Sequence, residues 1–306
     1  MRPLSVLALA LIAACAKGAP APRTLVLYEA ASLSAPMRAI LDTFSRRTGV
    51  SVEEEHGASL ELARRITELQ RVPDVIALAD QEVFPELLVP AATTWYAIFA
   101  RNRMVIAYTP RSRFAGEISA QNWHDVVRRS GVRFGRTDPV QAPAGYRALI
   151  TFALAEQYYG LPGLARRLEG AAPSSLVRGN AADLAALLET GELDYIIEYE
   201  SLARSHRFSF LVLPADIDLS DASRAAIYRR ASVRVAHGRD TVTRTGAPIE
   251  YGVSVPSAAP HADTGREFVR FLLSAEGQEM LHRGFVDAIP SPEFRGKAPS
   301  SLRGSP

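Results

Sequence analysis

Cysteine is nearly absent from this chain of 306 residues, and closely spaced pairs of histidines are missing. Because Cys15 is the only cysteine, a disulfide within the chain, a redox pair of cysteines and a cysteine-rich metal cluster are all excluded. No two histidines show the HxH or HxxxH spacing that brings two imidazoles to one face of a strand or helix, so no zinc site is expected. The six histidines are His56, His124, His206, His237, His261 and His282.

An excess of one charge and a long apolar run are missing as well. The 35 Lys and Arg residues nearly balance the 33 Asp and Glu residues and are spread along the chain, so the electrostatic footprint of a nucleic-acid-binding protein is absent. The apolar run from Leu4 to Ile12 is about half as long as the ~20 residues of a transmembrane helix. Neither GxSxG nor HExxH occurs, which leaves a secreted hydrolase as a remote alternative.

The N-terminus has the parts of a secretion signal. Arg2 supplies a positive charge, the apolar run follows, and small residues precede Cys15. The segment Ile12-Ala13-Ala14-Cys15 also resembles a bacterial lipobox, in which the cysteine becomes the lipid-modified first residue of the mature protein. We therefore predict a signal peptide at residues 1–14, a lipidated Cys15 and a linker at residues 15–23. The alternative is an ordinary signal peptide with an incidental cysteine.

Strand and helix patterns alternate along the rest of the chain. A buried strand at Thr24 to Tyr28 is followed by apolar residues at helical spacing, and Gly49 ends that helix. The helical positions are Met37, Ile40, Leu41 and Phe44. This alternation predicts an α/β fold, and about 290 mature residues suit two lobes. The predicted boundaries are 24–100 with 250–290 for the first lobe, 101–249 for the second lobe and 291–306 for a disordered tail.

Three strand-to-helix turns carry the candidate ligand groups, at residues 30–36, 56–61 and 135–146. Open α/β sheets bind ligands at the carboxyl ends of their strands, and helix N-termini attract anions through unpaired N–H groups. Ser34 is expected as an N-cap, which leaves Ser32 as a free donor, and Ser59 begins another helix. A serine before a helix is more often only a cap, but three such turns together favour an anion site.

The residues of these turns resemble the periplasmic molybdate/tungstate-binding proteins of ABC transporters, in particular the tungstate branch. The resemblance extends from about Thr24 to Pro290. Its most specific segments are 31–34 (ASLS), 135–139 (GRTDP), 143–149 (PAGYRAL) and 194–203 (DYIIEYESLA), with weaker support from 102–108 and 251–256. It implies a type II periplasmic-binding-protein clamshell whose lobes are mostly parallel sheets flanked by helices. It also implies a monomer that binds an oxyanion without a cofactor or catalytic step and delivers it to a permease.

The same resemblance implies the residues of the binding site. The expected ligand contacts are Ser32, Ser59, Asp138, Ala144, Glu198 and Tyr199, with Leu33, Ala58, Pro139 and Glu200 as further candidates. Asp138 and Glu198 are implied to approach the tungsten or molybdenum atom of the oxyanion directly, although Glu200 could replace Glu198.

Two carboxylates beside a dianion require a physical explanation, because like charges in a dry cleft repel by several kcal/mol. A carboxylate oxygen could bond the metal atom itself, which tungsten and molybdenum tolerate, or a shared proton could turn the contact into a hydrogen bond, as in phosphate binding. Phosphate or sulfate is therefore an alternative ligand. Without the resemblance, Asp138 is a turn residue before Pro139, Glu198 an exposed charge and Tyr199 a packing residue. Arg136 and Arg147 could pair with Asp138 or face the ligand.

Overall fold

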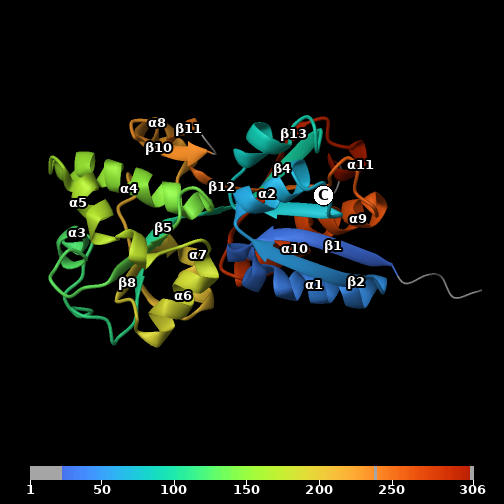
Figure 1. The fold of residues 1–306 in the computed structure, drawn as a ribbon. Coiled ribbons are helices and arrows are strands. Elements are labelled where there is room, and N and C mark those ends of the chain that lie inside the picture. The colour runs from blue at the N-terminus through green and yellow to red at the C-terminus, as the bar shows by residue number, and fades with distance from the viewer. Residues whose placement is uncertain (1–22, 238–239, 304–306) are drawn as a thin grey trace, which may run out of the picture.

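A computed structural model describes residues 23–237 and 240–303. In it the chain forms two lobes, each built on one β-sheet with helices against it (Figure 1). No helix in these two ranges is both long and apolar enough to cross a membrane. The predicted signal peptide, Cys15 and nearly all of the predicted linker lie outside the described residues.

The first lobe contains a sheet of six strands in the order β13-β4-β12-β3-β1-β2. Its strands are β1 (Thr24–Ala30), β2 (Ser51–Gly57), β3 (Val75–Leu78), β4 (Trp95–Asn102), β12 (Ile249–Ser254) and β13 (Asp287–Gly296). Its helical segments are η1 (Ala31–Leu33), α1 (Ser34–Thr48), α2 (Ser59–Thr67), η2 (Phe84–Leu88), α9 (Ala262–Leu273), α10 (Ala275–Arg283) and α11 (Ser300–Arg303).

The second lobe contains a sheet of five strands in the order β7-β6-β8-β5-β9. These strands are β5 (Met104–Tyr108), β6 (Phe134–Thr137), β7 (Val177–Arg178), β8 (Tyr195–Tyr199) and β9 (Ser209–Val212). The helical segments are α3 (Trp123–Val126), α4 (Pro143–Tyr159), α5 (Leu164–Ala171), η3 (Ser174–Leu176), α6 (Ala181–Thr190), α7 (Glu200–Ser205), η4 (Ala222–Arg224) and α8 (Ala225–Tyr228). A separate antiparallel hairpin, β10 (Ser232–His237) with β11 (Asp240–Thr245), was not predicted.

The α/β fold class with two lobes is confirmed, but both sheets are mixed and not mostly parallel. In the first lobe β2, β1 and β3 are parallel, whereas β12 runs antiparallel to both β3 and β4. In the second lobe β7, β6 and β8 are parallel, whereas β5 runs antiparallel to β8. The reason is the crossing between lobes: β5 enters the second lobe directly after β4, and β12 returns the chain to the first. Each of these two strands therefore runs antiparallel to its neighbours in the sheet that it joins.

The first helix shows how the apolar spacing produces the core. The predicted positions Met37, Ile40, Leu41 and Phe44 are all buried on the side of α1 that faces the sheet. Gly49 follows the helix with φ of 70°, a left-handed conformation that glycine adopts without steric cost, and it ends α1 as predicted. The pattern of the sequence thus explains both the position and the length of this helix.

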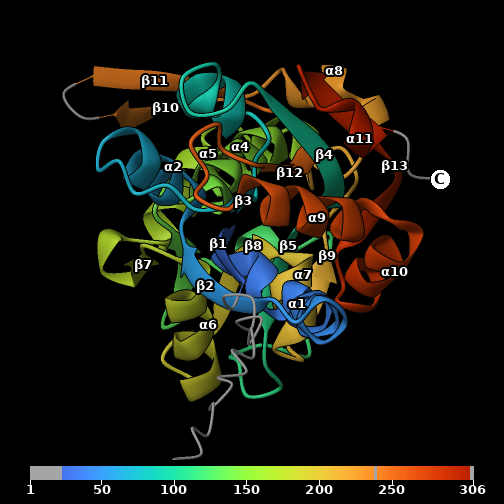
Figure 2. The same cartoon turned by 90° about the vertical axis from the view of Figure 1, so that its right-hand side faces the viewer.

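The predicted disordered tail is wrong for residues 291–303. Its first part continues β13, which pairs with β4, and α11 follows. Both lie on the first lobe beside α10 and α9 (Figure 2). The ring centroids of Phe294 and Trp95 lie 6.3 Å apart, and Leu302 is buried. This Pro- and Arg-rich segment therefore makes apolar contacts, although its composition is typical of disorder. The first lobe therefore extends beyond the predicted end at residue 290.

Candidate functional site

The predicted turns converge on a cavity of about 30 Å³ between the lobes. The cavity lies at the carboxyl ends of β1, β2 and β3 in the first lobe and of β6 and β8 in the second, where open α/β sheets bind ligands. Its volume suits a small solute and not a sugar or peptide. The lining residues are Ala30, Ala31, Ser32, Gly57, Ala58, Ser59, Ala79, Thr137, Ala142, Pro143, Ala144, Asn180, Ala181, Glu198 and Tyr199.

The first lobe contributes two buried serine hydroxyls. Ser59 Oγ accepts a hydrogen bond of 3.0 Å from the Ala79 N–H, so its own hydrogen remains available for a ligand. Ser32 Oγ lies 3.3 Å from the hydroxyl of Tyr251, which in turn accepts a hydrogen bond of 2.7 Å from Asn102. These contacts hold both serines in place without using all of their hydrogen-bonding capacity.

Two helices begin at the cavity without a side-chain cap. The N-cap residues are Ala58 for α2 and Ala142 for α4, and neither can accept a hydrogen bond through its side chain. The first N–H groups of a helix have no partner within the helix, and the macrodipole makes this end positive. Pro143 at the start of α4 has no N–H, which makes the Ala144 N–H the first donor of that helix. Backbone donors from both lobes can therefore approach an anion.

Among the described residues, Glu198 is the only acidic residue that lines the cavity, and it is fully buried. Its Oε1 accepts a hydrogen bond of 3.0 Å from the Tyr199 N–H, whereas Oε2 has no hydrogen-bond partner among the described residues. Burial raises the pKa of Glu198 to about 7, although the Tyr199 N–H and the neighbouring Thr137 hydroxyl lower it. The buried Thr137 hydroxyl also has no partner within the described ranges. Two polar groups of the second lobe thus remain available to a ligand.

An ion pair beside the cavity joins the two lobes. Nη2 of Arg147 in α4 lies 2.9 Å from Oδ1 of Asp80, which follows β3, and the Tyr146 hydroxyl donates to the same carboxylate. Nη1 of Arg147 donates to the Ala79 carbonyl and to the Tyr199 hydroxyl, each over 2.7 Å. Burial lowers the pKa of Arg147, but Asp80 and Tyr199 raise it by more, so this pKa lies above its usual value. Arg147 therefore pairs with Asp80, which the sequence did not single out, and not with Asp138.

The structure does not bring Asp138 to the cavity. Its Oδ1 accepts a hydrogen bond of 2.7 Å from the Val140 N–H, and its carbonyl accepts one of 3.0 Å from Ala142. This is the local turn that an aspartate before a proline commonly forms. Thr137 contributes the lining side chain at this turn, and Arg136 donates to the Thr137 carbonyl.

The other predicted residues separate into two groups. Ser32, Ser59, Ala58, Ala144, Glu198 and Tyr199 all line the cavity, whereas Leu33, Pro139 and Glu200 do not. Leu33 lies in the core of the first lobe. Ser34, the predicted N-cap, is the first residue of α1 and donates to the Ala31 carbonyl.

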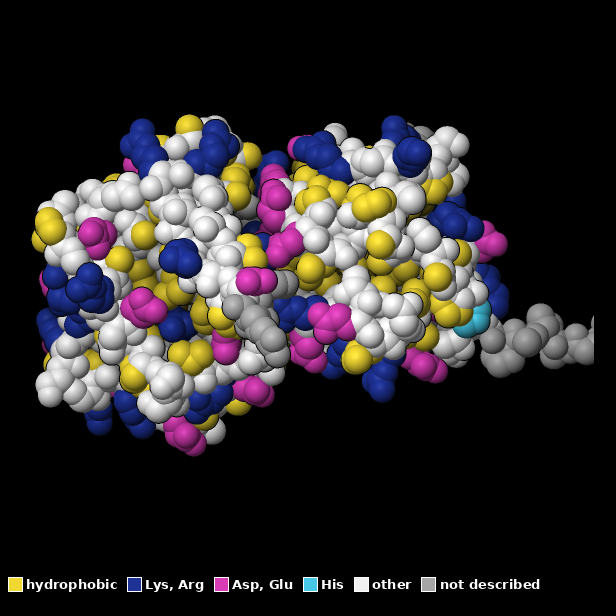
Figure 3. Space-filling view, turned by 45° about the horizontal axis from the view of Figure 1, so that its top comes forward, with side chains coloured by type: hydrophobic (Ala, Val, Ile, Leu, Met, Phe, Trp, Pro, Cys, Tyr) yellow, Lys and Arg dark blue, Asp and Glu magenta, His cyan; other side chains and the backbone are white. Residues whose placement is uncertain are grey.

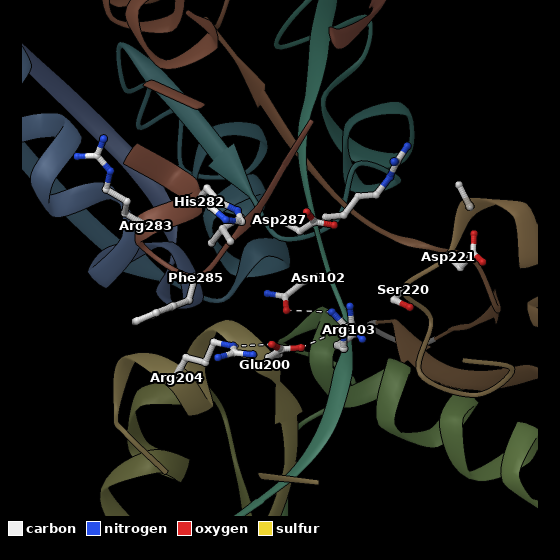
Figure 4. Close-up of a pocket in the computed structure, with 13 residues that line it drawn as sticks. Asn102, Arg103, Glu200, Arg204, Ser220, Asp221, His282, Arg283, Phe285 and Asp287 are labelled. Atoms are coloured by element: carbon white, nitrogen blue, oxygen red, sulfur yellow. Dashed lines mark hydrogen bonds and ion pairs between the residues drawn. The ribbon is translucent and has the colours of Figure 1, made fainter. Parts of the chain in front are cut away.

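Glu200 belongs to a second, larger cavity of about 750 Å³ beside the strands that connect the lobes (Figure 4). Its carboxylate lies 2.9 Å from Nε of Arg103 and also pairs with Arg204. Arg101, at the same cavity, pairs with Glu250. Because these arginines already have acidic partners, this cavity is a weaker candidate for an anion than the small cavity between the lobes. On the molecular face of Figure 3, acidic and basic side chains are likewise interspersed.

Comparisons with known proteins agree with this arrangement. The family model described as bacterial extracellular solute-binding protein matches residues 25–285. An uncharacterized solute-binding protein of Petrotoga mobilis is 37% identical over 91% of this chain and 88% of its own length. The molybdate/tungstate-binding protein WtpA of Pyrococcus abyssi is 32% identical over 92% of this chain and 89% of its own.

Solved structures share the fold at low identity. The sulfate-binding protein SubI of Mycobacterium tuberculosis has a TM-score of 0.61 at 15% identity, covering 92% of this chain and 89% of its own. The periplasmic molybdate-binding protein of Azotobacter vinelandii has a TM-score of 0.61 at 13% identity, covering 86% and 98%. Such identities support the fold alone, whereas the family match covers most of the chain. The chain therefore belongs to the bacterial extracellular solute-binding proteins.

Proposed function

We propose that this protein captures tungstate or molybdate between its lobes and delivers the oxyanion to the permease of an ABC importer. The observation that carries the proposal is the small cavity in which two uncapped helix starts and the serine hydroxyls converge. Relatives named molybdate/tungstate-binding proteins, at 32% and 34% identity over 92% of the chain, support the choice of ligand.

Neutral donors are the means by which this cavity would hold a dianion. Among the described residues, no Lys, Arg or His lines it. Hydroxyl and backbone N–H groups that are fixed in place stabilise negative charge through several short hydrogen bonds. Ser32 and Ser59 would donate from the first lobe, and the Ala144 N–H and the Tyr199 hydroxyl from the second.

Glu198 would then act in one of two ways. An ionised Oε2 could bond the tungsten or molybdenum atom, which expands the coordination of the metal beyond four. A protonated Glu198 could instead donate a hydrogen bond to an oxyanion oxygen, and a pKa of about 7 makes this form available near neutral pH. The contact of Asp138 with the metal atom stays a prediction, because Asp138 does not line the cavity and its Oδ1 accepts a hydrogen bond within its own turn.

Sulfate or phosphate is the second candidate ligand, and one observation favours it. In the described part of the chain a single acid, Glu198, lines the cavity, whereas two carboxylates were expected to bond the metal atom. One protonated carboxyl among neutral donors is compatible with any tetrahedral oxyanion, including sulfate and phosphate.

The proposal includes the cellular setting of the protein. Its family is extracytoplasmic, and its relatives are solute-binding proteins and not enzymes. We propose that residues 1–14 are removed on export, that Cys15 carries the lipid anchor, and that the mature protein works as a monomer without a cofactor. Mass spectrometry of protein purified from membranes would detect the lipid on Cys15.

Isothermal titration calorimetry with tungstate, molybdate, sulfate and phosphate tests the ligand. We expect micromolar or tighter binding of tungstate and molybdate and much weaker binding of the other two. The Ser59→Ala variant should weaken binding by about tenfold or more, because a hydrogen bond to a charged group contributes roughly 1.5–3 kcal/mol. Ser34→Ala, which removes a nearby hydroxyl that does not line the cavity, is the control. Preference for sulfate or phosphate would favour the second candidate, and no binding of any of the four would refute both.

A further inference from the structure

A group of three potential metal ligands lies on the first lobe, next to the oxyanion cavity but outside its lining. One nitrogen of His56 and one carboxylate oxygen each of Glu29 and Glu54 lie within 4.8 Å of one another. The parallel register places Glu29 of β1 directly beside His56 of β2, and Glu54 precedes His56 by two residues on the same face. The backbone therefore brings these three side chains together.

The buried carboxylate distinguishes this group from an ordinary surface cluster. Glu29 has no exposed surface, and its Oε2 has no hydrogen-bond partner in the described part of the chain. Its Oε1 lies 3.0 Å from Nδ1 of His56, whose side chain is 43% exposed. Burial raises the pKa of Glu29 to about 7, although the contact with His56 acts in the opposite direction and lowers it. The Glu29 carboxyl is therefore buried beside one partly exposed imidazole, and its second oxygen has no partner among the described residues.

From this geometry we propose a binding site for a divalent transition metal, with Zn²⁺ as the best match, formed by Glu29, Glu54 and His56. An imidazole nitrogen with two carboxylate oxygens is a donor set that Zn²⁺ accepts, and water would complete the coordination. Ca²⁺ and Mg²⁺ fit less well, because they prefer oxygen ligands alone and in larger number. The histidine spacing in the sequence gave no sign of this site, because its ligands come from two strands.

Calorimetric titration of ZnCl₂ into chelator-treated protein without a histidine tag tests the site. We expect one Zn²⁺ per chain and a loss of affinity of at least about tenfold in His56→Gln and in Glu54→Gln, since even residues that only support metal ligands commonly contribute that much. Glu53→Gln is the matched control, because Glu53 is an exposed neighbour whose side chain points to the other face of β2. It should bind Zn²⁺ as the unmodified protein does.

Two results would overturn the proposal: no zinc binding by the unmodified protein, or the same affinity in His56→Gln, Glu54→Gln and Glu53→Gln. Both substituted ligands are partly exposed, so the variants should fold, and circular dichroism checks this. The site does not depend on the oxyanion function. Tungstate titration of the same preparations keeps the two proposals separate, because the three zinc ligands do not line the oxyanion cavity.

Discussion

At the scale of single residues, Glu198 determines the electrostatic character of the cavity. It combines complete burial, one occupied oxygen and one oxygen without a partner in the described ranges. The carboxyl group therefore prefers its neutral form in the folded protein much more than in the unfolded chain. This preference links the stability of the protein to pH.

The sign of this linkage is a testable prediction. The pKa of Glu198 rises from 4.5 in the unfolded chain to about 7 in the fold, so the folded protein retains a proton that the unfolded chain releases. The contribution of Glu198 to the free energy of unfolding is complete below pH 4.5. It is lost as the pH rises through about 7, by about 3 kcal/mol in total. In Glu198→Gln this contribution should vanish. We expect the free energy of unfolding of the unmodified protein, relative to the variant, to fall between pH 4.5 and 8 in urea titrations without oxyanion.

Glu53→Gln again supplies the control, because it removes an exposed carboxylate and should leave the pH profile unchanged. A difference between the unmodified protein and Glu198→Gln that stays constant from pH 4.5 to 8 would show that the fold does not raise the pKa of Glu198.

Local patterns predicted the hydroxyl and backbone part of the site but not its charges. A serine at a strand-to-helix turn is visible in the sequence, and Ser32 and Ser59 lie where the turns placed them. Asp138 was predicted as a ligand contact, but it does not line the cavity, and its Oδ1 accepts a hydrogen bond within the turn before Val140. Thr137 was missed because nothing in the local pattern distinguishes a lining hydroxyl from a buried one. The pairing of Arg147 with Asp80 was also missed, because the two residues lie in different lobes and meet only in the folded protein.

At the scale of elements, close packing between the 135–146 turn and α4 positions the second-lobe donors. A Cβ at Gly145 would lie 2.4 Å from the carbonyl carbon of Asp138 and 2.5 Å from the nitrogen of Pro139. Both are backbone atoms that cannot move without shifting the turn. Glycine at this position therefore allows the helix start to approach the turn that carries Thr137.

We predict that Gly145→Ala lowers the free energy of unfolding by about 1–3 kcal/mol and weakens oxyanion binding, since the turn must move. Gly170→Ala in α5 is the matched control. A Cβ there meets nothing within 4 Å, and alanine should stabilise that helix by up to about 1 kcal/mol. Urea unfolding and calorimetry on both variants measure the effects. Unchanged stability and affinity in Gly145→Ala would contradict the close packing.

The elements themselves followed from periodicity where one face of a helix or strand is buried. The spacing of Met37, Ile40 and Phe44 predicted α1, and Gly49 predicted its end. The C-terminal segment was misjudged because its burial depends on β4, a partner far away in the chain. The opposite direction of β12 and β5 follows from the crossing between lobes, which no local pattern contains.

At the scale of the whole molecule, ion pairs connect the two lobes. The buried pair of Asp80 and Arg147 joins β3 to α4, and Arg244 of β11 pairs with Glu86 of η2. Lobe closure around a ligand is the change that a transporter can detect in a clamshell protein. These ion pairs therefore contribute to the balance between open and closed forms.

We predict that Asp80→Asn destabilises the protein by roughly 3–5 kcal/mol and shifts it toward an open form, because Arg147 keeps its buried charge without a partner. Urea unfolding measures the stability, and small-angle X-ray scattering should show a larger radius of gyration. The double variant Asp80→Asn with Arg147→Met removes both charges and should recover much of the lost stability. An Asp80→Asn protein as stable and compact as the original would show that the pair does not hold the lobes together.

The location of the bound oxyanion tests the central claim most directly. A crystal of the protein grown with tungstate should show a strong anomalous peak of tungsten in the cavity between the lobes. Hydroxyl oxygens of Ser32 and Ser59 and the Ala144 N–H should lie at hydrogen-bonding distance from the tungstate oxygens, with Glu198 in contact with the oxyanion. A peak in the larger cavity beside Arg103 and Glu200, or no tungsten in crystals soaked at high concentration, would contradict the proposed function.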